Sequence, residues 1–329
     1  MTGTSHEESG LAPARTRMAR DIRAGLASRP RSLPCMYFYD DAGSDLFEEI
    51  TRQPEYYQTR TEEALLAGLA GPLVAQLQPR ELVELGSGAG RKIRLLLGAM
   101  RARGLLERCV LFDVNELYLR SSVARLSAEY PEAAVCGVGG DFQRDLARLA
   151  RSPGGPRRLV LFLAGTIGNI APAEVPAFLC RVRPLLASGD GLLVGVDVVK
   201  DRAALEAAYN DRAGVTAAFN RNILAVVNRG LGADFDLQAW EHVAVWDERH
   251  AWIEMRLRSR ADQRVTIPAL GLELDFRRGE ELRTEISAKY TRESFAARLE
   301  GTGLRLQRWD TDPAARFALA LLGPENGAA

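Results

Sequence analysis

The sequence predicts an α/β fold, in which helices cover both faces of a doubly wound, mainly parallel sheet, together with a second α+β domain. Strongly apolar runs of strand length alternate with helical patterns from residue 60 to residue 200. Two more such runs, joined by an Asp-Pro turn, follow near the C-terminus, and a block over residues 201–289 interrupts the alternation. Strands that are apolar along their whole length are buried on both faces, which is typical of parallel sheets.

Each element of the alternation has its own pattern. Residues 59–77 have apolar side chains at helical spacing, with Thr59 or Thr61 available as the N-terminal cap. Short continuous apolar runs bounded by glycine or polar residues indicate buried strands. In order, the sequence predicts a strand at 81–88, a helix at 91–104, a strand at 109–115, a helix at 116–130, strands at 133–142 and 157–169, a helix at 172–186, a strand at 191–199, a helix at 294–303 and a strand–turn–strand hairpin at 303–322.

The block over residues 201–289 predicts a separate α+β insertion. Helical patterns at 201–232 are followed by two alternating stretches at 242–259 and 263–287. An aromatic-rich stretch at 36–66 shows neither strand alternation nor a clean helical stripe, and we expect it to pack with the insertion. The predicted organisation is a mobile tail over 1–20, a main domain over 60–200 and 290–329, and an α+β domain over 21–59 and 201–289.

Composition argues against several kinds of partner. Lys plus Arg and Asp plus Glu both number 43, so no net charge attracts nucleic acid or an anionic membrane. No apolar run reaches the roughly 18–20 residues of a membrane span, and the polar start lacks the apolar segment of a secretory signal. The four cysteines are widely spaced, and the histidines beyond the tail have no paired ligand. We therefore expect a cytoplasmic monomer with reduced thiols and no bound metal.

The basic residues are unevenly divided between the two types. Only Lys92, Lys200 and Lys289 are lysines, among 43 lysines and arginines. We interpret this scarcity as a compositional bias toward arginine and alanine.

A glycine-rich turn follows the first predicted strand. Residues 84–92 read E-L-G-S-G-A-G-R-K, which places Gly86 and Gly88 where a strand gives way to a helix. Glycines let the backbone approach a ligand closely, and a helix start offers N–H groups to it. Alone, this turn suits a dinucleotide, S-adenosylmethionine or no ligand at all.

Acidic residues end the next two strands. Asp113 stands where a carboxylate can accept both hydroxyls of a ribose, although it could instead cap the following helix. Asp141 and Phe142 stand where an acid and an adjacent ring suit an adenine, although Phe142 could be a core residue. Together with the glycine turn they favour a nucleoside-bearing cofactor, either NAD or S-adenosylmethionine. The C-terminal hairpin favours the second, because Rossmann-like methyltransferases usually end in one, and Asn169 would then lie where it could meet a substrate.

The sequence resembles the histidine-specific N-alpha-methyltransferases of ergothioneine biosynthesis, in a family that also includes fungal dimethylallyltryptophan N-methyltransferases. The resemblance starts at about residue 30 and rests on YFYDDAGSDLFEEITRQPEYYQTR, ELGSGAGRK, FLAGTIGN, AAYNDRAGVTAAFNRN, the IEM of HAWIEMRL, and RTEISAKY. It implies a Rossmann-like class I methyltransferase domain with a C-terminal antiparallel hairpin. It also implies S-adenosylmethionine as methyl donor and trimethylation of L-histidine to its betaine, hercynine.

The resemblance implies a role for each of several residues. The donor would be held by Tyr39, Gly86, Gly88, Lys92, Asp113, Asp141 and Phe142. The substrate would be held by Asn169 and Tyr209 at its carboxylate, by Glu285 and Ser287 at its imidazole, by Met255 on the ring and by Tyr56 near the amine. The main domain would then bind the cofactor, the α+β domain would recognise the substrate, and the tyrosine-rich stretch would cover both ligands.

These residue types suit the implied chemistry. Methyl transfer from a sulfonium needs a neutral amine held in line, and no strong base is evident, so positioning and desolvation would supply most of the rate. Tyr39 and Tyr56 would act catalytically by stabilising the quaternary ammonium through their ring faces. Glu285 can accept from an imidazole N–H, and Ser287 can donate or accept at the other nitrogen. Glu285 and Met255 together favour histidine over tryptophan.

Two positions depart from the residues usual in the family. Ala164 adds a methyl group near the expected amine, and Asn115 changes a helix cap.

The motifs leave three alternative functions. One alternative is an N-methyltransferase of tryptophan or another aromatic amino acid. Another is a catalytically silent S-adenosylmethionine-binding relative, against which the intact Asn169, Tyr209 and Glu285 argue. An NAD-dependent oxidoreductase ranks third, because no proton relay is evident.

Overall fold

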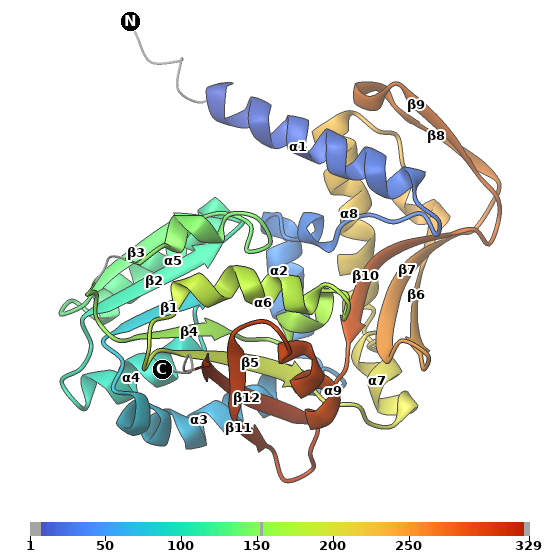
Figure 1. Ribbon diagram of the computed structural model, residues 1–329. Coiled ribbons are helices and arrows are strands. Elements are labelled where there is room, and N and C mark those ends of the chain that lie inside the picture. Colours follow the sequence, from blue (N-terminus) through green and yellow to red (C-terminus); the bar gives the residue numbers. More distant parts are fainter. Residues whose placement is uncertain (1–7, 152–153, 326–329) are drawn as a thin grey trace, which may run out of the picture. The chain divides into compact units, whose positions relative to one another are not determined.

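The computed structural model describes residues 8–151 and 154–325 (Figure 1). The chain divides into two compact units, each assembled from three separated segments. Unit 1 comprises Met1–Tyr56, Arg202–Asp247 and Ile253–Ile286. Unit 2 comprises Tyr57–Asp201, Glu248–Trp252 and Ser287–Ala329. Neither unit is one continuous stretch of sequence.

Unit 2 is built on a seven-stranded sheet with the order β11-β12-β5-β4-β1-β2-β3. Strands β1 to β5 pair in parallel, whereas β12 runs antiparallel to both β5 and β11. The strands are β1 (Glu81–Leu85), β2 (Arg108–Asp113), β3 (Ala134–Gly139), β4 (Arg158–Phe162), β5 (Gly191–Asp197), β11 (Leu304–Thr311) and β12 (Phe317–Pro324). The predicted parallel sheet and its C-terminal antiparallel hairpin are confirmed.

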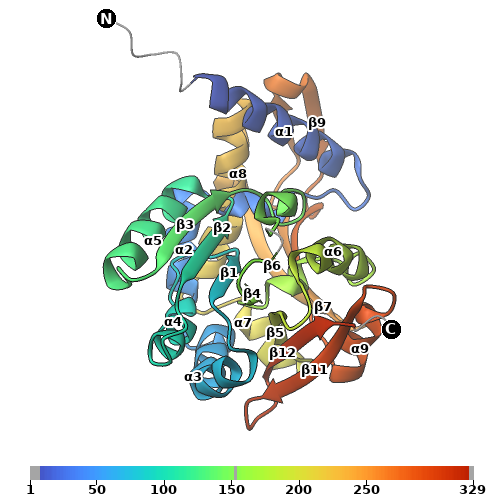
Figure 2. The ribbon, with the colours of Figure 1, turned by 60° about the vertical axis from the view of Figure 1, so that its left-hand side comes forward.

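Helices cover both faces of this sheet (Figure 2). α3 (Tyr57–Leu77), α4 (Ile93–Arg101) and α5 (Glu116–Glu129) pack on one face, and α6 (Val175–Val182) and α9 (Arg292–Ala296) on the other. Every residue of β1 and β4 is buried, as coverage on both faces requires. One predicted detail is wrong: α3 begins at Tyr57, so Thr59 and Thr61 lie inside the helix and do not cap it.

The loops that follow β1, β2 and β4 leave the same edge of the sheet. β1 lies between β2 and β4, and both pairings are parallel, with Glu84 opposite Leu111 and Leu161. The carboxyl ends of parallel strands gather at one edge, which is where open α/β sheets bind ligands. Short 3₁₀ turns complete the unit: η2 (Leu146–Leu149), η3 (Thr166–Asn169), η4 (Arg183–Leu185) and η7 (Ala297–Leu299).

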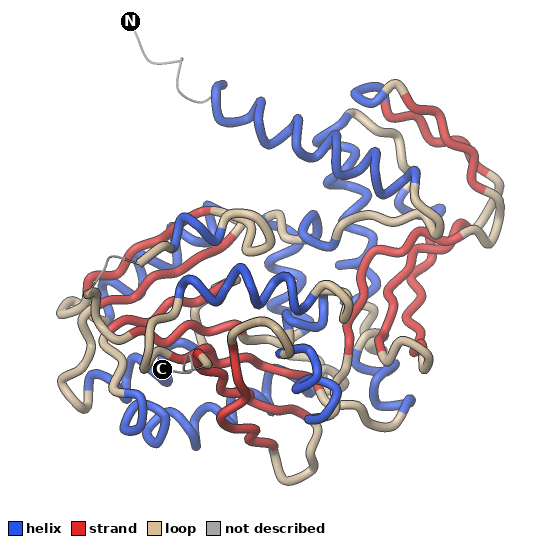
Figure 3. Tube along the Cα trace, in the orientation of Figure 1, coloured by secondary structure: helices blue, strands red, loops and turns tan. Residues whose placement is uncertain are grey.

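The described residues of unit 1 form a three-stranded sheet, a separate hairpin and four helices, and Figure 3 draws the helices in blue and the strands in red. The sheet has the order β10-β7-β6, and β8 pairs antiparallel with β9. The strands are β6 (Trp240–Asp247), β7 (Trp252–Ser259), β8 (Gln263–Ile267), β9 (Leu272–Phe276) and β10 (Glu281–Ala288). The helices are α1 (Glu8–Ala27), α2 (Asp41–Ile50), α7 (Arg202–Ala208) and α8 (Val215–Leu231), with 3₁₀ turns η1 (Cys35–Phe38), η5 (Leu237–Ala239) and η6 (Pro268–Leu270).

Helix α1 differs from the predicted tail over residues 1–20. Residues 8–20 belong to this helix, and residues 1–7 lie outside the described part of the chain. Met18, Ile22 and Leu26 recur every four residues and are buried. The sulfur of Met18 lies where a side chain at Gly230 of α8 would stand. One packed apolar stripe stabilises this helix, and because its other residues are mainly alanine, glycine and charged residues, the sequence shows no wide apolar face and reads as a tail.

Candidate functional site

The glycine turn after β1 borders open space. Gly86, Gly88 and Gly90 have φ angles of 71°, 47° and 63°, the left-handed region that glycine adopts without strain. A Cβ at Gly86 or Gly88 would meet no atom within 4 Å, whereas one at Gly90 would contact Leu126 of α5. The first two glycines therefore leave room for a ligand, and the third lets the turn pack on a helix.

Asp113 ties the glycine turn to the end of β2. Its Oδ2 accepts the Gly88 N–H at 2.8 Å, and its Oδ1 accepts the Asn115 N–H at 2.9 Å. Burial raises the pKa of Asp113, and these backbone N–H groups oppose the rise. Each carboxylate oxygen has a second lone pair for a further donor. The cap of α5 is the Asn115 side chain, which accepts the Tyr118 N–H, so Asp113 does not have that role.

Glu62 of α3 joins the glycine turn to the loop after β4. Its buried carboxylate pairs with the ammonium group of Lys92, the residue before α4. Its two oxygens lie 3.0 and 2.9 Å from the Ala164 nitrogen, whose N–H they accept. Ala164 has a φ of 63°, a left-handed conformation that costs a non-glycine residue roughly 1–2 kcal/mol. Glu62 was not predicted as a site residue, because in the sequence it is one of two adjacent glutamates on a helix.

Glu84 of β1 is a second buried acid at this edge of the sheet. Burial raises the pKa of Glu84 to about 8; the charges of Glu62 and Asp113 add to the rise, and Lys92 opposes it. Its Oε2 has no hydrogen-bond partner among the described residues. Glu84 is therefore mostly protonated at neutral pH, so β1 enters the glycine turn with a neutral carboxyl group.

Asp141 and Phe142 follow β3. Asp141 Oδ1 accepts the Gln143 N–H at 2.8 Å. The half-buried Phe142 ring packs edge-on against Phe162 and Phe178, with ring centroids 5.1 and 6.1 Å apart. Phe142 is thus partly a core residue, and the rest of its surface is left for a ligand.

The turn η3 brings the loop of Asn169 against the end of β10. Asn169 is the last residue of η3 and is half-buried. A Cβ at the preceding Gly168 would stand only 2.8 Å from the carbonyl oxygen of Ala288 and 3.2 Å from Ser287 Oγ. Because only glycine permits this approach, Gly168 holds the Asn169 loop close to Ser287.

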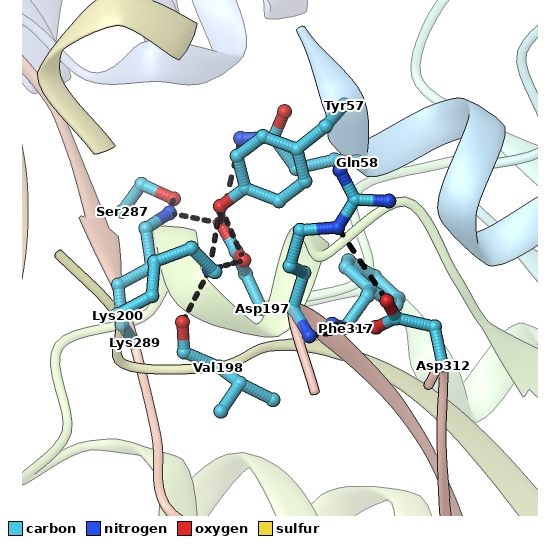
Figure 4. Close-up of polar contacts among 10 residues, drawn as sticks. Tyr57, Gln58, Asp197, Val198, Lys200, Ser287, Lys289, Asp312 and Phe317 are labelled. Carbon is cyan, nitrogen blue, oxygen red and sulfur yellow. Dashed lines mark hydrogen bonds and ion pairs between the residues drawn. The ribbon is translucent and has the colours of Figure 1, made fainter. Parts of the chain in front are cut away.

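Buried polar side chains surround Asp197, the last residue of β5 (Figure 4). The Tyr57 hydroxyl donates to Asp197 at 2.8 Å, and the Lys200 and Lys289 ammonium groups lie 2.6 and 3.0 Å from its oxygens. Lys289 also donates to Ser287 Oγ at 2.7 Å. Burial acts to raise the pKa of Asp197, but the charges of Lys289 and Lys200 outweigh it and hold the pKa below its usual value. We call these five residues the Asp197 cluster.

All three lysines of the chain pair with buried carboxylates. Lys92 pairs with Glu62, and Lys200 and Lys289 pair with Asp197. Compositional bias explains the many arginines but not this placement. The rarity of lysine was therefore the sequence signal that could have identified these positions.

Four aromatic residues of the N-terminal stretch, Phe38, Tyr39, Phe47 and Tyr56, form one cluster with Tyr209 and Phe219 from the insertion, all within unit 1. The Tyr39 ring meets Phe47 and Phe219 edge-on, with centroids 5.9 and 5.7 Å apart. The Tyr56 ring meets Phe47 and Tyr209 in the same way, at 6.1 and 6.4 Å. The structure thus brings Tyr39, Tyr56 and Tyr209 into one aromatic cluster, in which Tyr56 and Tyr209 are buried.

The backbone of Tyr209 is held by a neutral histidine. His242 Nε2 lies 2.8 Å from the Tyr209 carbonyl oxygen, and His242 Nδ1 lies 2.8 Å from Asn220 Nδ2. A carbonyl oxygen can only accept, so Nε2 carries the proton and Nδ1 accepts from the amide. Burial lowers the pKa of His242, which keeps this ring neutral. Asn220 Oδ1 in turn accepts from Thr284 Oγ1 at 2.6 Å.

Met255 and Glu285 lie on the neighbouring strands β7 and β10. Met255 is buried, and its carbonyl oxygen lies 3.0 Å from Thr284 Oγ1. Glu285 is 9% exposed and stands two residues before Ser287 along β10. Both predicted ring-binding residues therefore belong to one small sheet, Met255 on its central strand and Glu285 on an edge strand.

Other predicted features concern metals, membranes and thiols. Within residues 8–151 and 154–325, no group of three or more His, Cys, Asp or Glu residues is placed to hold a metal ion. In that same part of the chain, none of the helices has both the length and the apolar character of a membrane span. All four cysteines are unpaired, and burial raises the pKa of Cys109 to about 12.

Comparison with known proteins identifies similar sequences. The family model described as "Histidine-specific methyltransferase, SAM-dependent" matches residues 18–324. Histidine N-alpha-methyltransferase of Mycolicibacterium smegmatis is 51% identical over 304 residues, which are 92% of this chain and 94% of that protein. The protein of the same name from Mycobacterium tuberculosis is 45% identical over 304 residues, with the same coverage of 92% and 94%. Ergothioneine biosynthesis protein 1 of Schizosaccharomyces pombe is 34% identical over 225 residues, which are 66% of this chain and 29% of that protein.

Proposed function

Because this chain belongs to the family of histidine-specific, S-adenosylmethionine-dependent methyltransferases, we propose that it methylates the α-amine of L-histidine. Three successive transfers would give hercynine, and this conversion would be the first step of ergothioneine biosynthesis. The observation that carries this proposal is the 51% identity, over 92% of the chain, to a histidine N-alpha-methyltransferase.

The residues at the glycine turn fit the methyl donor. Gly86 and Gly88 border open space, as close backbone approach to a ligand needs. Each oxygen of Asp113 can accept one further donor, which matches the two hydroxyls of a ribose. When bound, S-adenosylmethionine supplies an electrophilic methyl group on a sulfonium. The remaining residues proposed to hold it are Lys92, Asp141, Phe142 and Tyr39, and unit 2 is the proposed cofactor domain.

The substrate has three polar parts, each with a matching set of side chains. The Asn169 amide and the Tyr209 hydroxyl can both donate to its carboxylate. Glu285 can accept from the imidazole N–H, and Ser287 can bond to the other ring nitrogen. Met255 would pack on the ring and Tyr56 would lie near the amine. Unit 1 is the proposed substrate-recognition domain.

Methyl transfer needs the substrate amine in its neutral form, with its lone pair in line with the donor's methyl group. The ring faces of Tyr39 and Tyr56 attract a cation by roughly 0.5–2 kcal/mol each, so they favour the ammonium that develops. Contacts in the aromatic cluster fix the orientation of both rings. Positioning and exclusion of water supply the rest of the rate, because no described residue is assigned as a strong base.

The experiment that tests the function is mass spectrometry of the purified protein incubated with S-adenosylmethionine and an equimolar mixture of the twenty amino acids. We expect three methyl groups on histidine and none on the others. Methylation of tryptophan would keep the donor assignment but contradict the roles of Glu285 and Met255. No methylation of any amino acid would favour a ligand-binding relative without activity.

The variant Asp113→Ala tests the donor site separately. Each charge-assisted hydrogen bond contributes roughly 1.5–3 kcal/mol, so we expect calorimetry to show at least about a tenfold loss of donor affinity. Asp113→Asn keeps one acceptor oxygen and should lose less. Thermal unfolding without ligand controls for the loss of the Gly88 and Asn115 contacts. Unchanged donor affinity in Asp113→Ala would refute the ribose assignment.

We further propose that the protein is a monomer in the cytoplasm, with L-histidine and the donor as its only partners. The balanced charge, with 43 basic and 43 acidic residues, supports the exclusion of nucleic acid and anionic membranes. Light scattering coupled to size exclusion should give a mass near 36.1 kDa. A mass of twice that value would contradict the monomer.

A further inference from the structure

The Asp197 cluster ends at a proposed substrate-binding residue. Its hydrogen bonds run from Tyr57 through Asp197 and Lys289 to Ser287, with Lys200 as a second cation on Asp197 (Figure 4). Asp197, Ser287 and Lys289 are all at most 4% exposed. Buried ion pairs stabilise a fold no better than well-packed apolar residues do, so stability alone does not explain three charged groups here.

The chemistry of the groups fixes the direction of these hydrogen bonds. The Lys289 ammonium has only donors, so Ser287 Oγ accepts at 2.7 Å. The Asp197 carboxylate has only acceptors, so it accepts a hydrogen bond from each of Tyr57, Lys200 and Lys289. A hydroxyl that accepts from a cation is polarised, and it becomes a stronger donor and a weaker acceptor. Lys289 therefore prepares the Ser287 O–H to donate.

We propose that Lys289 is a specificity-determining positioning residue, which makes Ser287 a hydrogen-bond donor and so selects the neutral imidazole of the substrate. This inference rests on the proposed function, in which Ser287 meets the ring. A neutral imidazole has one unprotonated nitrogen that can accept from Ser287, and its N–H remains for Glu285. An imidazolium carries N–H groups on both nitrogens, so one of them would face Ser287 Oγ, which is a weakened acceptor because it already accepts from the Lys289 cation.

The charged and titratable groups of the cluster define the pH range of a test. Asp197 on β5 is held as a carboxylate by the ammonium groups of Lys200 and Lys289, and the Tyr57 hydroxyl and the Gln58 amide also donate to it. Glu285 is the acid on β10 nearest in sequence to Ser287. The substrate imidazole has a pKa near 6.5, so between pH 5.5 and 7.5 it is the group expected to change its charge.

The experiment measures the Kd of L-histidine by calorimetry at pH 7.5 and 5.5, with S-adenosylhomocysteine present so that no transfer occurs. If only the neutral ring binds, the wild-type Kd should rise by about tenfold at the lower pH, since about one ring in ten is then neutral. In Lys289→Met the Ser287 hydroxyl can turn and accept, so the rise should fall below about threefold. Lys289→Arg keeps a cationic donor and should restore the larger rise.

Two further measurements keep the result decisive. S-adenosylhomocysteine affinity at both pH values should be the same in wild type and Lys289→Met, which controls for the fold. If Lys289→Met does not fold, Ser287→Ala should show the same reduced rise. A wild-type Kd that does not rise on acidification, or a tenfold rise that persists in Lys289→Met or in Ser287→Ala, would overturn the inference. Histidine that is neither bound nor methylated by the wild type would instead refute the proposed function.

Discussion

Replacing Glu62 by alanine is expected to lower the free energy of unfolding by about 3–5 kcal/mol, because it leaves the mostly buried Lys92 ammonium without its carboxylate. The change also removes the acceptor of the Ala164 N–H, at a residue whose backbone is strained. Two loops at the ligand-binding edge of the sheet lose their common anchor. We therefore expect at least a tenfold loss of donor affinity as well. Calorimetry measures the donor affinity, and urea unfolding measures the free energy of unfolding.

Glu63→Ala is the matched control. Glu63 is the next residue of the same helix and lies 3.9 Å from Arg91, the residue before Lys92, but both side chains are partly exposed. Exposed ion pairs contribute roughly 0–1 kcal/mol, so this variant should keep both its stability and its donor affinity. Equal losses in the two variants would show that burial of the Glu62 pair is not the cause.

Glu285→Ala is expected to weaken L-histidine binding by about 10- to 100-fold, which corresponds to the roughly 1.5–3 kcal/mol of a hydrogen bond to a charged group. Donor affinity should change by less than about twofold, because Glu285 is assigned to the ring alone. Calorimetry with each ligand separately distinguishes the two effects. Equal weakening of both ligands would place Glu285 outside the substrate site.

Glu281→Ala provides the control for this variant on the same strand. Glu281 is half-buried at the start of β10 and pairs with Arg256 and Arg258, both at 2.7 Å. Its removal should lower stability slightly and leave histidine affinity unchanged. A matching loss of histidine affinity would mean that the Glu285 effect reflects a disturbed strand.

The strands and helices of unit 2 could be predicted because burial on two faces leaves a plain pattern. β4 and β5 are buried along their whole length and appear in the sequence as nearly continuous apolar runs, whereas the equally buried β1 also carries Glu81 and Glu84. Helix α1 was missed because its stripe of Met18, Ile22 and Leu26 is thin and surrounded by polar residues. Its stability comes from packing on a helix far away in the sequence, which a local pattern does not reveal.

The residues proposed to touch ligands could be inferred from motifs, but the residues that support them could not. Glu62 and Ala164 are 102 positions apart, and Tyr57 and Asp197 are 140 apart. Only the folded sheet brings such partners together. Lysine was the available clue, because the sequence contains only three lysines and each of them pairs with a buried carboxylate.

The position of β12 has a consequence for how the protein is made on the ribosome. All eight residues of β12 are buried between β5 and β11, although they come near the end of the sequence, at 317–324. Unit 1 has all its segments once residue 286 has been translated. Unit 2 still lacks an inner strand at that moment, and β5 presents an apolar unpaired edge to other nascent chains. Unit 2 is therefore the part of the protein most in need of chaperone protection during synthesis.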